Sequence, residues 1–333
     1  MRVLLIKTSS LGDVIHTLPA LTDALRALPD IRFDWVVEEG FAEIPAWHPA
    51  VANVLPVAIR RWRKQPLRSL FSDEWKRFRE RLQDSHYDLV IDAQGLLKSA
   101  WLTRYGRAPV AGFNRDSVRE PLACRFYDQT YFVSREQHAI ERVRQLFGQA
   151  LGYQPSAELG DYGLDREQLA DRESEPYLLF LHGTTWPSKH WPEAQWRDLA
   201  ERMCAFGWPI RLPWSSDEER ARAERVAEGL ELVSVLPRLS LAGIAKVIAS
   251  ARACVAVDTG LGHLAAALDV PTVSLYGPTV PTRVGAYGRS QVHLCASGPN
   301  AGSGDRQKPC FETLLAEQVA GELKLLLRAP DLP

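Results

Sequence analysis

The sequence predicts an α/β protein made of two doubly wound domains, each built around a parallel sheet. Three observations support this class. Short apolar runs alternate with amphipathic stretches along the chain, a pattern typical of βαβ units. A polar stretch at 153–176 interrupts the alternation, which then restarts. Finally, 333 residues suffice for about two domains with a substantial core.

The first half is expected to form one domain, 1–160. We expect strands at 3–7, 33–37, 54–59 and 89–92, and helices at 13–28, 75–83 and 136–151. A linker is expected at 161–176. The second domain, 177–310, is expected to hold strands at 177–181, 209–212, 232–235, 254–257 and 272–275, with helices at 192–206, 217–228, 241–250 and after Gly260. A loop at 297–309 and a final helix within 311–330, packed near the domain junction, complete the prediction.

Composition excludes several classes of protein. The chain is 46% hydrophobic and 24% charged with a net charge of −1, which excludes low-complexity disorder and a collagen-like fibre and argues against a dedicated nucleic-acid binder. No apolar run approaches the roughly 18 residues of a membrane span, and the run at 3–6 is too short for a signal peptide. The cysteines are odd in number, widely spaced and without a CxxC pair, so we expect a reduced, cytoplasmic protein (Cys124, Cys204, Cys254, Cys295, Cys310).

In paired doubly wound domains, ligands bind at the carboxyl ends of the strands, so the cleft between domains is the expected site. The first strand is followed by KTSSLGDV at 7–14, which is neither GxGxxG nor a Walker loop. Asp13 within it has two interpretations: a carboxylate that stabilises a helix start, or a general base facing the cleft.

The segment RRWRK at 60–64 is densely basic, and 60–81 carries nine basic and three acidic residues. It is either a solvated charge run or a clamp for phosphates and carboxylates. In the second domain, Thr184, Thr185 and Lys189 follow a strand and suit a phosphate, although an ordinary polar turn would look the same. The neighbouring Trp191, Trp196 and Trp214 are expected to pack in the core.

The sharpest pattern is VDTGLGHL at 257–264, where a strand ends at Asp258 and small residues lead into an Ala-rich helix. Free N–H groups at that helix start would form an anion site. The alternative is that Asp258 caps the helix and His263 is a core histidine. Glu219, in the first turn of another helix, either favours the helix dipole or accepts ribose hydroxyls.

These motifs together resemble the family-9 heptosyltransferases of lipopolysaccharide core assembly, and within them the type I members. The resemblance covers nearly the whole chain except 297–309, and it is carried by KTSSLGDVIHTLPALTDAL at 7–25, DWVVEEGF at 34–41, IRRWRK at 59–64, IDAQGLLKSA at 91–100, REPLA at 119–123, KHWP at 189–192 and VDTGLGHLAAALD at 257–269. It implies a GT-B fold, with two Rossmann-like domains facing each other across a cleft.

The resemblance also implies an activity and its participants. The donor would be ADP-L-glycero-β-D-manno-heptose, the acceptor the inner Kdo of Kdo2-lipid A, and transfer would invert the anomeric carbon in one displacement. No DxD motif is present, which favours a mechanism without a metal ion, and no other cofactor is expected. The enzyme would be a monomer that binds no nucleic acid and sits peripherally on the cytoplasmic face of a Gram-negative inner membrane, where residues 60–81 would meet anionic lipid.

Site residues follow by matching positions to the family motifs. Asp13 matches the general base and Lys189 a catalytic donor to the leaving diphosphate. Donor-binding positions are Thr184, Thr185, Lys189, Glu219, Leu239, Asp258, Thr259, Gly260 and His263. Acceptor-binding positions are Ser10, Gly12, Arg60, Arg61, Arg63, Lys64 and Arg119.

Two alternatives stay open. A type II or III heptosyltransferase would use an acceptor that already bears heptose, and the basic cluster together with VVEEGF disfavours it. A non-catalytic nucleotide-sugar-binding protein could share the fold. It would need no base, so the presence of Asp13 beside the donor motif disfavours it.

Overall fold

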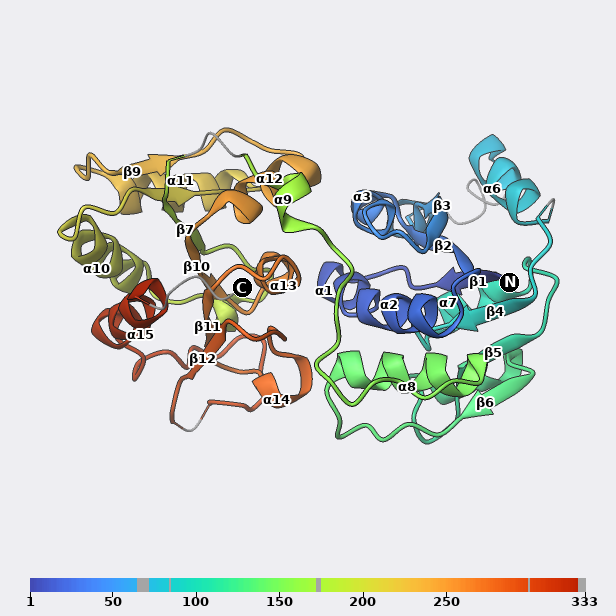
Figure 1. Ribbon diagram of the computed structural model, residues 1–333. Coiled ribbons are helices and arrows are strands. Elements are labelled where there is room, and N and C mark those ends of the chain that lie inside the picture. Colours follow the sequence, from blue (N-terminus) through green and yellow to red (C-terminus); the bar gives the residue numbers. More distant parts are fainter. Residues whose placement is uncertain (65–71, 84, 172–174, 299, 329–333) are drawn as a thin grey trace. The chain divides into compact units, whose positions relative to one another are not determined.

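The computed structural model describes residues 1–64, 72–83, 85–171, 175–298 and 300–328. Part of the basic segment 60–81, of the expected linker and of the 297–309 loop lies outside these residues. The chain forms two compact units, Met1–Leu164 and Asp165–Pro333. Figure 1 shows both units.

Unit 1 is a six-stranded parallel sheet with helices on both faces. Its strand order is β3-β2-β1-β4-β5-β6, so the chain reverses direction across the sheet between β1 and β4. The elements are β1 (Arg2–Ile6), α1 (Leu11–Ile15), α2 (Leu18–Ala27), β2 (Arg32–Glu38), η1 (Glu39–Phe41), α3 (Glu43–Ala46), β3 (Val51–Val57), α4 (Ile59–Trp62), α6 (Asp73–Gln83), β4 (Leu89–Asp92), α7 (Leu97–Thr103), β5 (Val110–Phe113), η2 (Pro121–Phe126), β6 (Gln129–Tyr131) and α8 (Ala139–Leu151).

Unit 2 repeats the topology. Its order is β12-β11-β10-β7-β8-β9, with the reversal between β7 and β10. The elements are α9 (Arg166–Leu169), β7 (Leu178–Leu181), η3 (Pro187–Lys189), α10 (Glu193–Cys204), β8 (Ile210–Leu212), α11 (Asp217–Ala227), β9 (Val233–Val235), α12 (Leu241–Ser250), β10 (Ala253–Val257), α13 (Gly260–Ala267), β11 (Thr272–Tyr276), α14 (Pro281–Val284), β12 (Gln291–Cys295) and α15 (Ala316–Arg328). The predicted class, α/β with two doubly wound parallel sheets, is confirmed.

Several predicted elements differ from the structure. The single helix expected at 13–28 is wrong: α1 ends at Ile15 and α2 begins at Leu18. Pro19 lies at the start of α2, where it lacks an N–H and its ring would clash inside a continuous helix. The final helix begins at Ala316 rather than 311. Strands β5, β6 and β12 were not predicted, because they are short or only half-buried and their periodicity is weak.

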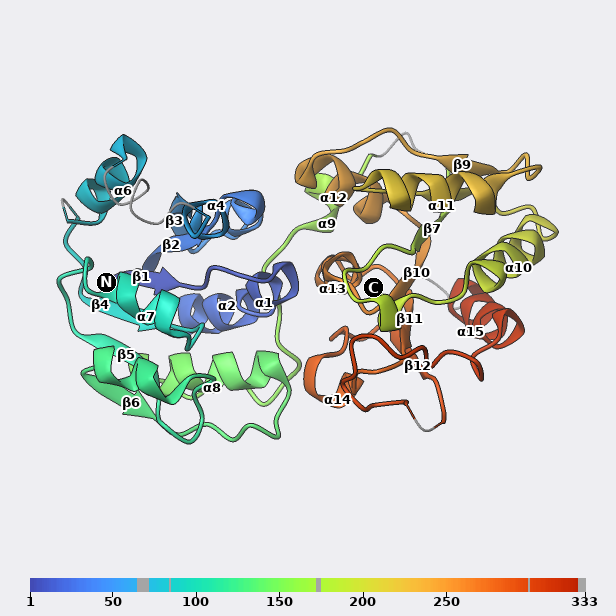
Figure 2. The ribbon, with the colours of Figure 1, turned by 180° about the vertical axis from the view of Figure 1, so that it is seen from behind.

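Each sheet is covered by amphipathic helices whose apolar faces enter the core. In unit 2, Trp191 and Trp196 are almost fully buried, as predicted, and Trp191 donates its indole N–H to the Leu314 carbonyl at 2.9 Å. The same prediction is wrong for Trp214, which is only partly buried and donates to the Leu236 carbonyl at 2.6 Å. Helix α15 lies against α10 and against strands β10 and β11, so it completes the core of unit 2 (Figure 2). Among the described residues no helix is both long and apolar enough to cross a membrane.

One buried ion pair ties two helices of unit 1 together. Arg144 on α8 is 1% exposed and donates to Asp23 on α2 at 2.6 Å. The same guanidinium donates to Glu141 and to the carbonyls of Ser156 and Glu158, so its donors are well used. The pair thus fixes α8 against α2, which lie side by side in Figure 1.

We predict that Arg144→Ala lowers the free energy of unfolding by about 3–5 kcal/mol, because it leaves the Asp23 carboxylate buried without its partner. Urea unfolding followed by circular dichroism measures this. Lys76→Ala is the matched control in the same unit, since Lys76 and Glu80 form an exposed pair on α6. Equal shifts in the two variants would contradict the role of the buried pair.

Candidate active site

In both units, the chemistry-bearing side chains gather at the carboxyl ends of the two central strands. This is the point of a doubly wound sheet where ligands bind, because the connections on either side diverge and leave a crevice. In unit 1 the segments after β1 and β4 meet there, and in unit 2 those after β7 and β10. Parallel pairing brings Ile6 beside Asp92, and Leu181 beside Ala256.

In unit 2, Lys189 and Asp258 form the centre of the cluster. Lys189 Nζ lies 2.6 Å from Asp258 Oδ2, and both side chains are largely buried. Asp258 also accepts the Thr279 hydroxyl at 2.6 Å, and its backbone carbonyl accepts that of Thr184 at 3.1 Å. His263 Nε2 lies 3.8 Å from Asp258 Oδ1. The motifs after β7 and β10 therefore form one polar cluster.

The start of α13 adds backbone donors to this cluster. Thr259 is the N-cap residue, and its side chain makes no capping hydrogen bond. The interpretation of Asp258 as the helix cap is therefore wrong, because its carboxylate is used by Lys189 and Thr279. The first amides of a helix lack intrahelical partners, and the helix dipole favours an anion there. This end of α13 can therefore receive negative charge.

Glu219 lies close to the segment after β7. A Cβ atom on Gly183 would be 2.5 Å from Glu219 Oε1, so the carboxylate lies directly against the backbone of this segment. Glu219 is in the first turn of α11, and its Oε2 accepts the Ser215 N–H and hydroxyl, each at 2.7 Å. The structure therefore satisfies the helix-start interpretation and also places the carboxylate at the strand end.

Two other predicted donor residues lie further out. Thr185 is exposed on the segment after β7, and Leu239 lies beside Gly243 in the connection that leads into α12. Buried His182 was not predicted. Burial lowers its pKa to about 4, so the ring is neutral near pH 7 and adds no positive charge to the cluster.

In unit 1, Asp13 is held at the start of α1. Its Oδ2 accepts the Ser10 N–H at 2.7 Å and the Ser10 hydroxyl at 3.1 Å, so the helix-start role is realised. The side chain remains 35% exposed, and its Oδ1 lies 4.0 Å from Lys7 Nζ. Gly12 is buried beside it. Ser10 thus orients the carboxylate, which remains accessible from solvent. A general base needs both properties.

The turn that carries Asp13 is supported by buried polar groups that were not predicted from the sequence. Lys7 is 6% exposed and donates to the Ala93 carbonyl at 2.9 Å, and burial lowers its pKa. Gln94 accepts the amides of Thr8 and Ser9, each at 3.0 Å, which fixes the turn after β1. Fully buried Asp92 accepts four hydrogen bonds, from Gln94 N, Gly95 N, Ser99 Oγ and Tyr127 Oη. The signal in the sequence that could have identified these groups is an Asp and a Gln at the end of a buried strand.

The predicted acceptor arginines are not alike. Arg61 donates to Glu74 at 2.7 and 2.9 Å and to Glu39 at 3.1 Å, so its guanidinium is engaged within the unit. Arg60 lies over the Phe41 ring at 5.2 Å. The other predicted basic residues, Arg63, Lys64 and Arg119, are exposed. Lys98, which donates to Ser9 Oγ at 3.0 Å, is a further cation at this end of the sheet.

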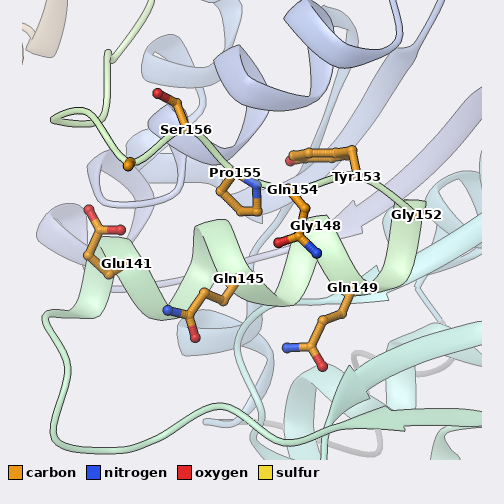
Figure 3. Close-up of a pocket in the computed structure, with 10 residues that line it drawn as sticks. Glu141, Gln145, Gly148, Gln149, Gly152, Tyr153, Gln154, Pro155 and Ser156 are labelled. Atoms are coloured by element: carbon orange, nitrogen blue, oxygen red, sulfur yellow. The ribbon is translucent and has the colours of Figure 1, made fainter.

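A separate hollow lies on unit 1 between α8 and the segment that returns along it. Figure 3 shows Gln145 and Gln149 on the helix, with Tyr153 and Pro155 on the returning segment. None of the predicted site residues lines it. Within the described ranges, no three His, Cys, Asp or Glu side chains are grouped as metal ligands.

The model of glycosyltransferase family 9 (heptosyltransferase) matches residues 75–314. The chain belongs to glycosyltransferase family 9. It is 65% identical to lipopolysaccharide heptosyltransferase 1 of Pseudomonas aeruginosa, over 99% of both chains. Among solved structures, it is similar to E. coli heptosyltransferase WaaC with ADP, at a TM-score of 0.90 and 47% identity over 98% of this chain and 100% of that one. The same protein with ADP-2-deoxy-2-fluoro heptose gives a TM-score of 0.87 at 47% identity, over 98% and 99%. This family-9 glycosyltransferase therefore has the GT-B fold that the motifs implied.

Proposed function

We propose that this enzyme transfers heptose from ADP-L-glycero-β-D-manno-heptose to the inner Kdo of Kdo2-lipid A, as a type I heptosyltransferase of lipopolysaccharide core assembly. The observation that carries the proposal is the juxtaposition of Lys189, Asp258 and the start of α13 at the carboxyl ends of β7 and β10. The full-length similarity to a protein named heptosyltransferase 1 supports type I.

The donor is proposed to bind to unit 2. Lys189 and the first amides of α13 would hold the diphosphate, with the hydroxyls of Thr184 and Thr185 beside it. Glu219 would accept the ribose hydroxyls, and Leu239 would border the adenine. Asp258, which orients Lys189 at 2.6 Å, and His263 would complete the donor site. Similarity to a structure that contains ADP supports this assignment.

Transfer is proposed as a single inverting displacement. Asp13 would take the proton from the attacking Kdo hydroxyl as the new bond forms at the anomeric carbon, while the ADP leaving group departs with the bonding electrons. Lys189 and the α13 amides would stand where the negative charge of the leaving group develops, so stabilising that charge would require little reorganisation. The step as proposed uses no metal.

The acceptor is proposed to bind to unit 1. Ser10 and Gly12 would contact the acceptor beside the base, and Ser10 also bonds the Asp13 carboxylate. Arg60, Arg63, Lys64 and Arg119 would meet the carboxylates and phosphates of Kdo2-lipid A. Arg61 was placed in this group from its motif. Arg61 donates to Glu39 and Glu74. To bind the acceptor, it would have to break these hydrogen bonds.

We predict that Asp13→Ala lowers kcat by roughly 10²–10⁴-fold while the Kd for ADP stays close to the wild-type value, because the base acts on the acceptor. Single-turnover transfer and calorimetric ADP titration measure the two quantities. Glu231→Ala, which removes an exposed carboxylate from the turn before β9 in unit 2, is the control and should retain turnover. Weakened ADP binding with retained turnover in Asp13→Ala would contradict the assignment and favour a binding protein.

Membrane association is proposed to use the basic face of α6. That helix buries Trp75, Phe78 and Leu82 and leaves its basic side chains exposed (Lys76, Arg77, Arg79, Arg81). A Lys or Arg near an anionic surface contributes about 1 kcal/mol. The enzyme would then be peripheral on the cytoplasmic face of the inner membrane, where its acceptor is anchored.

We predict salt-sensitive binding to vesicles that contain anionic lipid, and weaker binding after Arg77→Gln with Arg81→Gln, by roughly fivefold per residue. Vesicle co-sedimentation at low and high salt measures it. The matched control is Arg220→Gln with Arg225→Gln, which removes the same charge from α11 in unit 2. Salt-independent binding, or equal loss in both double variants, would disprove a role for this helix face.

A further inference from the structure

The 300–308 segment, onto which no family motif could be transferred, is fixed beside the donor cluster by hydrogen bonds. The amides of Gly302 and Gly304 donate to the carbonyls of Gly277 and Pro278, at 2.9 and 2.7 Å. Both of those carbonyls follow β11, immediately before Thr279, which bonds Asp258. The segment therefore runs along the same carboxyl edge of the sheet.

A second set of contacts joins this segment to η3, the turn that carries Lys189. Ser188 Oγ donates to the Asp305 carbonyl at 2.7 Å, and the Ser188 amide donates to the Arg306 carbonyl at 3.3 Å. Ser188 is 1% exposed, so these bonds are protected from water. The backbone of Arg306 is thus tied to the residue that precedes Lys189.

The side chain of Arg306 lies against the same ring as Lys189. Its Cζ lies 4.5 Å from the centre of the Trp186 ring, and Lys189 Nζ lies 4.3 Å from that centre. Trp186 therefore contacts two cations, one from each segment. Cation–π contact is favourable, but it neutralises neither charge.

The charges of the two cations are not equally compensated. Lys189 is paired with Asp258 at 2.6 Å. Within the described part of the chain, Arg306 has no carboxylate within ion-pair distance, and its side chain is exposed. A diphosphate carries at least two negative charges, which the Lys189–Asp258 pair with the α13 dipole does not balance. The free cation held at this edge would supply the missing positive charge.

We propose that Arg306 is a further donor-binding residue, which contacts the diphosphate of a nucleoside-diphosphate ligand from the loop at 300–308. This inference rests on the proposed donor site. The planar guanidinium suits two phosphate oxygens at once, and its tethered backbone reduces the entropy lost on binding. The loop thereby contributes to donor affinity, with Trp186 as the ring that orients both cations.

The test is calorimetric titration of the full-length enzyme with ADP and with adenosine. Arg306→Ala is expected to weaken ADP binding by roughly 10-fold or more, the usual effect of losing a charge-assisted hydrogen bond, and to leave adenosine binding unchanged. Arg306→Lys should retain part of the ADP affinity. Lys308→Ala is the matched control, because it removes the same charge from the same loop. The Lys308 ammonium lies 4.0 Å from the Asp305 carboxylate and makes no contact with Trp186 that corresponds to that of Arg306. The ADP affinity of Lys308→Ala should equal that of the wild type.

Three outcomes would overturn the inference. The first is an unchanged ADP affinity in Arg306→Ala. The second is an equal weakening of ADP and adenosine binding in that variant, which would indicate that Arg306 only packs on Trp186. The third is an equal loss of ADP affinity in Lys308→Ala, which would indicate a non-specific charge effect. Failure of the proposed function looks different. In that case the wild-type enzyme would not bind ADP, whatever residue stands at 306.

Discussion

The parallel pairing of β7 with β10 is the constraint on which the proposed donor site depends. Because Leu181 lies beside Ala256 in the register, the segments that follow the two strands emerge at the same edge. That juxtaposition allows Lys189, which lies 69 positions before Asp258 in the sequence, to meet it at 2.6 Å. The start of α13 and the bonds from Thr184 and Thr279 then follow from the same placement. A shift of register would separate all of them.

In unit 1, strand pairing likewise determines which side chains meet at the edge of the sheet. Pairing of β1 with β4 sets Ile6 beside Asp92, and the turn after β1 is then fastened to Gln94. This turn carries Ser10 and Asp13, so the orientation of the proposed base depends on buried groups that touch no substrate. The same topology thus places the start of a helix beside Lys189 in unit 2, and in unit 1 it places a partly exposed carboxylate beside the buried cation of Lys7.

Sequence reasoning recovered the two sheets and most of the central strands, because buried parallel strands form continuous apolar runs. The prediction failed where the hydrophobic periodicity was weak, as at β12, and where one residue interrupted a helical pattern, as Pro19 does at the start of α2. The motif residues of unit 2 were predicted to act together, and the structure brings most of them together. The partners of Arg61 and Arg306 could not be predicted, because ion pairs and ring contacts between distant segments leave no local pattern.

We propose above that this family-9 enzyme adds heptose to an acceptor that does not yet bear one. The most direct measurement is transfer from ADP-heptose to Kdo2-lipid A and, in parallel, to the same acceptor already heptosylated, with product masses determined by mass spectrometry. We expect a higher kcat/KM for Kdo2-lipid A and addition of a single heptose. A preference for the heptosylated acceptor would contradict it and indicate a type II enzyme, and no transfer to either acceptor would contradict the proposed reaction itself.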